Sequence, residues 1–212
     1  KHMKISPTLT EVKEIAKTGK YDILPVSCEI LSDFITPIEA MRILQNVSTH
    51  CYLLESAQAN EAWGRYTFLG YDPKLEINCI DGHMKLGKLS VETENPSEYI
   101  RQILSEYKSP KFDYLPSFTG GLVGYFSYDY LGYKEKCIRG KARDTEDFKD
   151  VDLMLFDKVI AFDNLCQKII LIANMSLDAP ETGYNKAIVE LKQLRELLMH
   201  GEKKQNMGGK LL

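Results

Sequence analysis

The chain has 212 residues, of which 44% are hydrophobic and 27% are charged, and its formal net charge at pH 7 is −3. These proportions are typical of a folded globular protein, and they exclude a disordered or fibrous chain. No basic run stands out, so we expect no binding to nucleic acid, which depends on clustered cations. The longest apolar stretches, 159–162 and 169–173, are far shorter than the ~20 residues of a membrane-spanning helix, so we expect no membrane partner.

Capping signals predict two helices in the first 50 residues. Thr8 and Glu11 have the spacing of a capping box, and the apolar positions that follow predict a helix ending before Gly19. The run 23–30 contains a proline and therefore reads as an edge strand. A second helix is predicted by Thr36 as N-cap, Pro37 at the first helical position and Glu39 as the capping glutamate, and it reaches about residue 47.

The middle of the chain is rich in strand signals. Apolar runs predict strands over 51–56, 65–70 and 75–80, and Asp81-Gly82 predicts a hairpin turn into 83–86. Asn95-Pro96 then begins a third helix. Its inward side chains are predicted to be Tyr99, Ile100, Ile103, Leu104 and Tyr107.

The last third of the chain completes an antiparallel pattern. The glycines of 120–128 predict a strand that passes close to another backbone, with its aromatic side chains packed on either side. Strands over 151–162 and 168–173 are predicted to form a hairpin in the middle of a sheet, and a final helix runs from Pro180 to Gly201. Neighbouring strands with few helices between them predict an α+β fold built on mainly antiparallel sheet, with flanking helices.

The residues alone reveal no catalytic centre and no metal site. The glycine-rich run at 120–124 lacks the spacing of a phosphate-binding loop, and the histidines lie too far apart to act as paired ligands. The cysteines are odd in number and too widely spaced for a zinc knuckle or a disulfide framework, which favours a reducing, cytoplasmic location. They are Cys28, Cys51, Cys79, Cys137 and Cys166.

One constellation is suited to a zwitterion. A strand ends in the carboxylate and hydroxyl of Glu55 and Ser56, a loop carries the tryptophan Trp63, and the next strand starts at the cation Arg65. Such groups can bond an ammonium and a carboxylate while apolar neighbours hold the remainder of a ligand. The structural alternative is that Glu55 and Arg65 simply pair with each other at the end of a sheet.

Four strings in this order resemble the N-terminal domain of anthranilate synthase component I. The resemblance covers nearly the whole chain. A close relative, component I of aminodeoxychorismate synthase in the folate pathway, shares much of the pattern. The strings are Leu53-Leu54-Glu55-Ser56, Trp63-Gly64-Arg65-Tyr66-Thr67-Phe68-Leu69-Gly70, Gly120-Gly121-Leu122-Val123-Gly124-Tyr125 and Phe162-Asp163-Asn164-Leu165.

The resemblance implies an enzyme that makes anthranilate and pyruvate from chorismate and ammonia in tryptophan biosynthesis. The ammonia comes from a glutamine amidotransferase subunit, component II. Mg²⁺ and the catalytic residues are expected in a further, C-terminal chorismate-binding domain. We therefore interpret 1–3 as a tag remnant, 4–200 as the N-terminal regulatory domain and 201–212 as the start of a linker, and we expect this chain alone to be inactive.

In the family that the chain resembles, this domain contributes to the feedback site for L-tryptophan. The resemblance assigns that site to Leu54, Glu55, Ser56, Arg65 and Tyr66. A hypothesis from another class remains open: a stand-alone amino-acid-binding or adaptor module with no enzyme attached.

Overall fold

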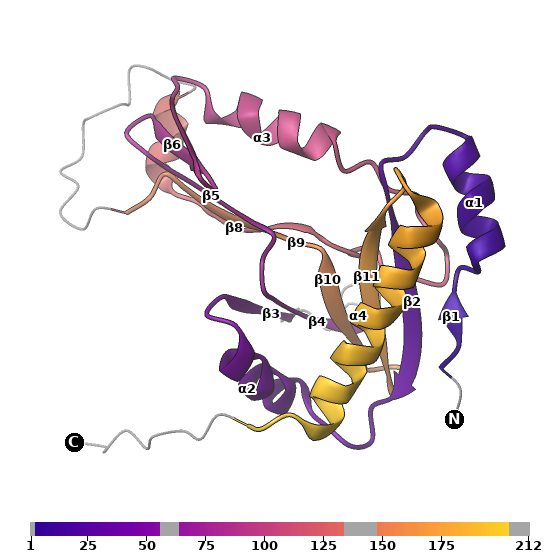
Figure 1. The fold of residues 1–212 in the computed structure, drawn as a ribbon. Helices are drawn as coiled ribbons and strands as arrows, with labels where there is room; N and C mark the ends of the chain where they lie inside the picture. The colour runs from indigo at the N-terminus through magenta and orange to yellow at the C-terminus, as the bar shows by residue number, and fades with distance from the viewer. Residues whose placement is uncertain (1–2, 56–63, 134–147, 204–212) are drawn as a thin grey trace, which may run out of the picture. The chain divides into compact units, whose positions relative to one another are not determined.

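The computed structural model describes residues 3–55, 64–133 and 148–203. It contains two antiparallel sheets and flanking helices, as Figure 1 shows. The chain divides into two compact units: the first is made of Lys1–Asp72, Ser109–Thr119 and Asp157–Leu212, and the second of Pro73–Lys108 and Gly120–Phe156. Within the described residues, no helix is both long and apolar enough to cross a membrane.

The first unit is built on a six-stranded sheet. The strand order is β1-β2-β11-β10-β4-β3, and all neighbouring strands are antiparallel. The strands are β1 Ile5–Ser6, β2 Ile23–Leu31, β3 Cys51–Glu55, β4 Tyr66–Tyr71, β10 Lys158–Asp163 and β11 Lys168–Ser176.

Three helices bury one face of this sheet. They are α1 Leu9–Lys17, α2 Pro37–Val47 and α4 Pro180–His200, the last of which lies along β2 and β11 in Figure 1. Their apolar stripes, including Val12, Leu44 and Leu191, join the inward side chains of the strands in one core. Burying a side chain such as Leu191 contributes about 1.5–3 kcal/mol. This core makes the sheet a rigid support for whatever its strand ends carry.

The opposite face of the same sheet has a smaller apolar cluster. Val159, Ala161, Ile170 and Ile172 form it, and the segment 109–119 packs against it through Leu115 and Phe118. Because side chains alternate along a strand, these four residues point away from the three helices. Tyr66 and Phe68 of β4 lie on this second face.

The second unit is a five-stranded sheet with one helix packed on it. The strand order is β7-β6-β5-β9-β8, and Ile77, Met84 and Val151 are fully buried under Ile100 of the helix. The elements are β5 Leu75–Ile80, β6 His83–Leu86, β7 Leu89–Glu92, α3 Pro96–Ser105, β8 Gly121–Phe126, the 3₁₀ segment η1 Tyr128–Tyr133 and β9 Val151–Phe156.

Several predicted features are confirmed. Both capping boxes form, with Thr8 bonded to Glu11 and Thr36 bonded to Glu39. The hairpin of β10 and β11 lies in the middle of its sheet. The close backbone approach is at Gly124, where an added Cβ would overlap the carbonyl oxygen of Asp152 on β9.

Other predictions need correction. The run 151–162 is two strands that break at Asp157 and enter different sheets. The strand containing Pro25 is not an edge strand, because β1 pairs with it at Ser27 and Cys28; Pro25 itself lies outside that pairing. The short strands β1 and β7 were not predicted; runs this short give little pattern, and neither was marked by a turn signal such as the one that marks β6.

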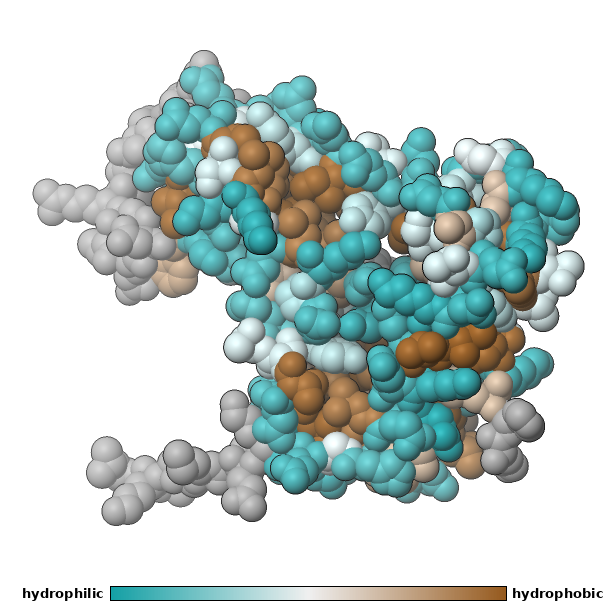
Figure 2. Space-filling model, in the orientation of Figure 1, coloured by the Kyte–Doolittle hydropathy of each residue, from teal (hydrophilic) through white to brown (hydrophobic). Residues whose placement is uncertain are grey.

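The predicted packing of some side chains is also wrong. Leu104 is exposed, and Tyr107 lies beyond the end of α3. Tyr125, Phe126 and Tyr128 are exposed as well, although packing on both sides was expected. Figure 2 shows that apolar side chains reach the surface over parts of both units.

Candidate functional site

The register of three strands places the family-matched residues at one end of the six-stranded sheet. Leu54 of β3 lies opposite Phe68 of β4, and Tyr66 of β4 lies opposite Asp163 of β10. Leu53 packs against the helix-covered core, so its neighbour Leu54 points to the other face, where Tyr66 and Phe68 also lie. The sheet therefore gathers one leucine and two aromatic rings on a single face.

Aromatic rings continue across this face. Tyr66 and Phe68 have ring centroids 5.8 Å apart, and Phe118 meets Phe68 edge to face at 5.5 Å. Tyr52 adds a further edge contact to Phe118 at 6.3 Å. Leu54, at the border of this cluster, is 44% exposed. An aromatic ligand could thus lie against a preformed apolar surface.

Arg65 forms an ion pair with Asp163 beside this surface. Its Nε and Nη2 donate to Oδ1 and Oδ2 of Asp163 at 3.0 and 2.6 Å. The guanidinium also lies over the ring of Tyr66, 5.0 Å from the centroid. The Arg65 side chain is 34% exposed, whereas that of Asp163 is 0% exposed.

The pair shifts the protonation of Asp163. Burial alone raises the pKa of this carboxyl, but the bonds from Arg65 and from the backbone N–H of Cys166 outweigh burial and lower the pKa to about 2. The same pairing raises the pKa of Arg65. Both groups are therefore charged at neutral pH, and their charges sum to zero.

The remaining two predicted site residues are placed differently. Glu55 follows Leu54 and pairs with Thr67, so it belongs to the helix-covered face, where its side chain is exposed at the sheet end. Ser56 lies outside the described residues. The alternative of a Glu55–Arg65 pair is not what forms, because Arg65 pairs with Asp163.

Asp163 was not predicted as a site residue. The sequence gives a weak signal for it, since Asp163-Asn164 stands where a hairpin turn must begin and aspartate commonly accepts N–H groups in turns. That it meets Arg65 depends on the antiparallel pairing of β4 with β10, between residues almost 100 positions apart in the chain. No local pattern encodes that pairing.

A hollow of about 530 Å³ lies at the neighbouring end of β2 and β11, within the first unit. Cys166 lines it beside the pair of Lys168 and Glu29, which are 2.6 Å apart. Arg195 and Met199 of α4 line it as well. Its charges are mixed, so it shows no preference for one sign of ligand.

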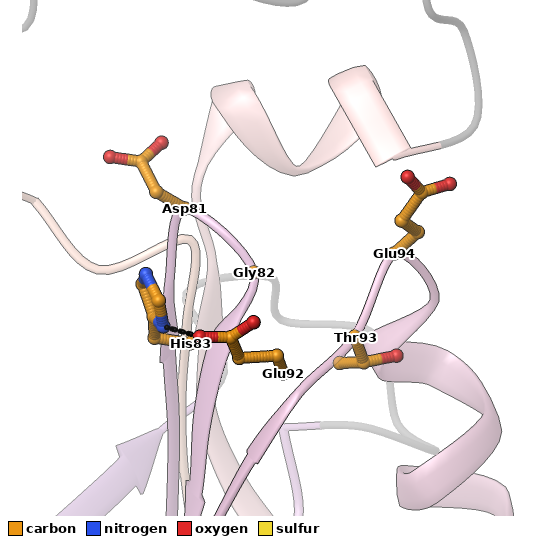
Figure 3. Close-up of a pocket in the computed structure, with 6 residues that line it drawn as sticks. All are labelled: Asp81, Gly82, His83, Glu92, Thr93 and Glu94. Atoms are coloured by element: carbon orange, nitrogen blue, oxygen red, sulfur yellow. Dashed lines mark ion pairs between the residues drawn. The ribbon is translucent and has the colours of Figure 1, made fainter.

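A shallower, acidic pocket of about 320 Å³ lies at the β5–β6 turn and the end of β7 (Figure 3). His83 Nδ1 lies 3.4 Å from Oε1 of Glu92, its partner on the neighbouring strand. The carboxylates of Asp81 and Glu94 lie on opposite sides of the pocket in Figure 3 and do not converge. Among the described residues, no group of three or more histidine, cysteine, aspartate or glutamate residues could hold a metal ion.

Comparisons with known proteins give a consistent relationship. The chain is 34% identical over 198 residues to anthranilate synthase component 1 from Acetivibrio thermocellus, a match that covers 91% of this chain and 39% of that protein. It is 36% identical over 196 residues to the protein of the same name from Pseudomonas aeruginosa, covering 89% of this chain and 39% of that protein. The chain is homologous to part of anthranilate synthase component 1. No family model matches it.

A solved structure supports the same relationship. The crystal structure of anthranilate synthase component I from Streptococcus pneumoniae TIGR4 matches with a TM-score of 0.50 and 25% identity, covering 78% of this chain and 36% of that chain. The resemblance to anthranilate synthase component I and the α+β fold class are thereby confirmed. The chain spans about two fifths of the length of these relatives.

Proposed function

We propose that this chain is the tryptophan-sensing region of a cytoplasmic anthranilate synthase, the enzyme that forms anthranilate and pyruvate from chorismate and ammonia. The observation that carries the proposal is the homology to anthranilate synthase component 1 over about nine tenths of the chain. The names of these relatives favour the anthranilate branch over aminodeoxychorismate synthesis. They also favour a biosynthetic enzyme over a stand-alone binding module.

The chorismate chemistry belongs to a part of the enzyme that this chain does not span. The Mg²⁺ expected for the enzyme is proposed to belong to that same part, and we assign no step to the ion in this chain. A glutamine amidotransferase subunit is the proposed source of ammonia. The contribution of this chain is then regulatory.

The geometry of the first unit fits tryptophan as the regulator. Leu54, Tyr66 and Phe68 offer one apolar face on which an indole could lie. Arg65, partly exposed beside that face, has donors for a carboxylate. The family resemblance adds Ser56 and Glu55 to the proposed site, and Glu55 lies at the sheet end on the face opposite Leu54.

Substitution of Ser56 tests the proposal in a polypeptide extended to the full length of the relatives. Ser56→Phe removes a hydroxyl partner and fills ligand space; the loss of one hydrogen bond to a charged group alone weakens binding roughly 10- to 150-fold. We expect tryptophan inhibition, measured against the uninhibited rate of each variant, to weaken by at least that factor. Ser105→Phe, at an exposed position on α3, is the control and should be inhibited normally. Unaltered inhibition of Ser56→Phe would refute the assignment.

A further inference from the structure

We propose that Asp163 is a positioning residue of the tryptophan site, which orients Arg65 so that the Nη1 end of its guanidinium faces the carboxylate of the ligand. The inference rests on the proposed function, because it takes Arg65 as the residue that meets that carboxylate. It adds a residue on a third strand, β10, to a site otherwise drawn from β3 and β4.

The carboxylate of Asp163 is held in one orientation. Its Oδ1 accepts from Arg65 Nε at 3.0 Å and from the backbone N–H groups of Leu165 and Cys166 at 3.2 and 3.0 Å. Its Oδ2 accepts from Arg65 Nη2 at 2.6 Å. The side chain is fully buried, so water does not compete for these bonds. A carboxylate fixed by four bonds can in turn fix the group that it pairs with.

Within the part of the chain that the structure describes, one end of the Arg65 guanidinium has no hydrogen-bond partner. A guanidinium has five N–H donors. Asp163 takes the one on Nε and one on Nη2, and the sulfur of Cys166 lies 3.4 Å from Nη2. Among the described residues none bonds to Nη1. Because Arg65 Cζ lies only 5.0 Å from the centroid of the Tyr66 ring, the Nη1 donors are close to the aromatic face.

This pre-organisation matters because an arginine side chain has many rotamers. Fixing a long side chain on binding costs about 0.5–1.5 kcal/mol, and that cost is removed when the protein already holds the group in place.

The substitution Asp163→Asn separates the orienting role from the role of this side chain in the hairpin turn. The amide keeps one oxygen, which can still accept from the backbone N–H groups of Leu165 and Cys166. It replaces the other oxygen by an NH₂ group, which cannot accept from Arg65 Nη2. The hairpin should therefore persist while Arg65 loses its second bond.

Glu29→Gln is the matched control. Glu29 pairs with Lys168 at 2.6 Å on the neighbouring strands, so its loss also breaks an ion pair at this end of the sheet. It has no bond to Arg65. Any effect of Asp163→Asn that Glu29→Gln lacks is therefore specific to Arg65.

The first experiment uses the 212-residue chain and needs no ligand. Exchange of the Arg65 Nε–H with water, followed by nitrogen-15 NMR, should be at least about tenfold faster in Asp163→Asn than in the wild type or in Glu29→Gln, because the bonds that hold this N–H are weakened. Equal exchange in all three would overturn the orienting role.

The second experiment measures tryptophan inhibition in the full-length polypeptide, each variant against its own uninhibited rate. Asp163→Asn and Arg65→Lys should each weaken inhibition about tenfold or more. The double variant should be inhibited no more weakly than Arg65→Lys alone, because Asp163 acts through Arg65.

Three outcomes would count against the inference. The inference is overturned if the two losses of tryptophan inhibition multiply in the double variant. It is also overturned if Asp163→Asn is inhibited normally while inhibition of Arg65→Lys is weakened. If Arg65→Lys and Ser56→Phe are both inhibited normally, the proposed function itself fails and takes this inference with it. Should Asp163→Asn not fold, Asp163→Ser replaces it under the same criteria.

Discussion

Arg65 and Asp163 differ in how much each could be recognised from the chain alone. Both residues belong to family-matched strings, but only the pairing of β4 with β10 shows that Asp163 lies beside Arg65. Leu54 and Glu55 give the converse case. They are neighbours in the string, yet alternation sends them to opposite faces of the sheet. The types of residue at the site were therefore predictable from the sequence, but which of them lie together on one face depends on the register of the paired strands.

The pair of Asp163 and Arg65 predicts an acid-dependent loss of stability. The folded-state pKa of Asp163 is lowered from 3.8 to about 2, so its contribution is complete above pH ~4 and is lost as the pH falls toward 2. The shift corresponds to about 2 kcal/mol of unfolding free energy. Urea unfolding of the 212-residue chain at pH 6 and at pH 2 measures this contribution. Between these pH values, the free energy of unfolding should fall by about 2 kcal/mol more in the wild type than in Asp163→Asn. Equal losses would show that this carboxylate does not hold the lowered pKa.

At the scale of elements, the helices were the most predictable parts. Thr8, Thr36 and Pro180 mark helix starts in the sequence, and α1, α2 and α4 begin directly after Thr8, after Thr36 and at Pro180. The break between β9 and β10 was not predictable, because Asp157 interrupts an apolar run without any glycine or proline. β9 pairs with strands of the five-stranded sheet and β10 with strands of the six-stranded sheet. The break between them therefore depends on tertiary pairing rather than on local sequence.

The glycines of β8 give a prediction for that element. Gly124 has a φ of +152°, and a Cβ there would overlap the carbonyl oxygen of Asp152 on β9. Gly121 has a φ of +134° with nothing within 4 Å of an added Cβ. Gly121→Ala should thus cost only the backbone strain of about 1–3 kcal/mol, while Gly124→Ala adds an overlap with backbone and should cost clearly more. Denaturant unfolding of the two variants compares them, and equal costs would contradict a close approach at Gly124.

For the whole molecule, the strings and the order of the elements were enough to indicate the family and fold class. They were not enough to show two compact units, because each unit is assembled from separate segments of the chain. The segment 109–119 is the clearest case: it follows the second unit's helix α3 in the chain but packs on the sheet face of the first unit. Sequence patterns predict local structure, but they do not predict which later segments of the chain pack against a sheet formed by earlier ones.

The 212-residue chain is expected to form no anthranilate. The chain spans about two fifths of the length of its relatives, and the proposed function assigns the chorismate chemistry to the part that it does not span. Incubation with chorismate, ammonium and Mg²⁺ should give no growth of anthranilate fluorescence. A signal that rises with time and with protein concentration would place the chemistry in this chain after all.

The most direct test of the regulatory assignment is to observe tryptophan at Leu54. In the full-length polypeptide with carbon-13 leucine methyl groups, L-tryptophan should shift the methyl signals of Leu54 by its ring current, with a midpoint equal to that of inhibition. Leu89, which is exposed on β7 of the second unit, serves as the control and should not shift. Methyl signals of Leu54 that stay in place at a tryptophan concentration that fully inhibits the enzyme would contradict the account.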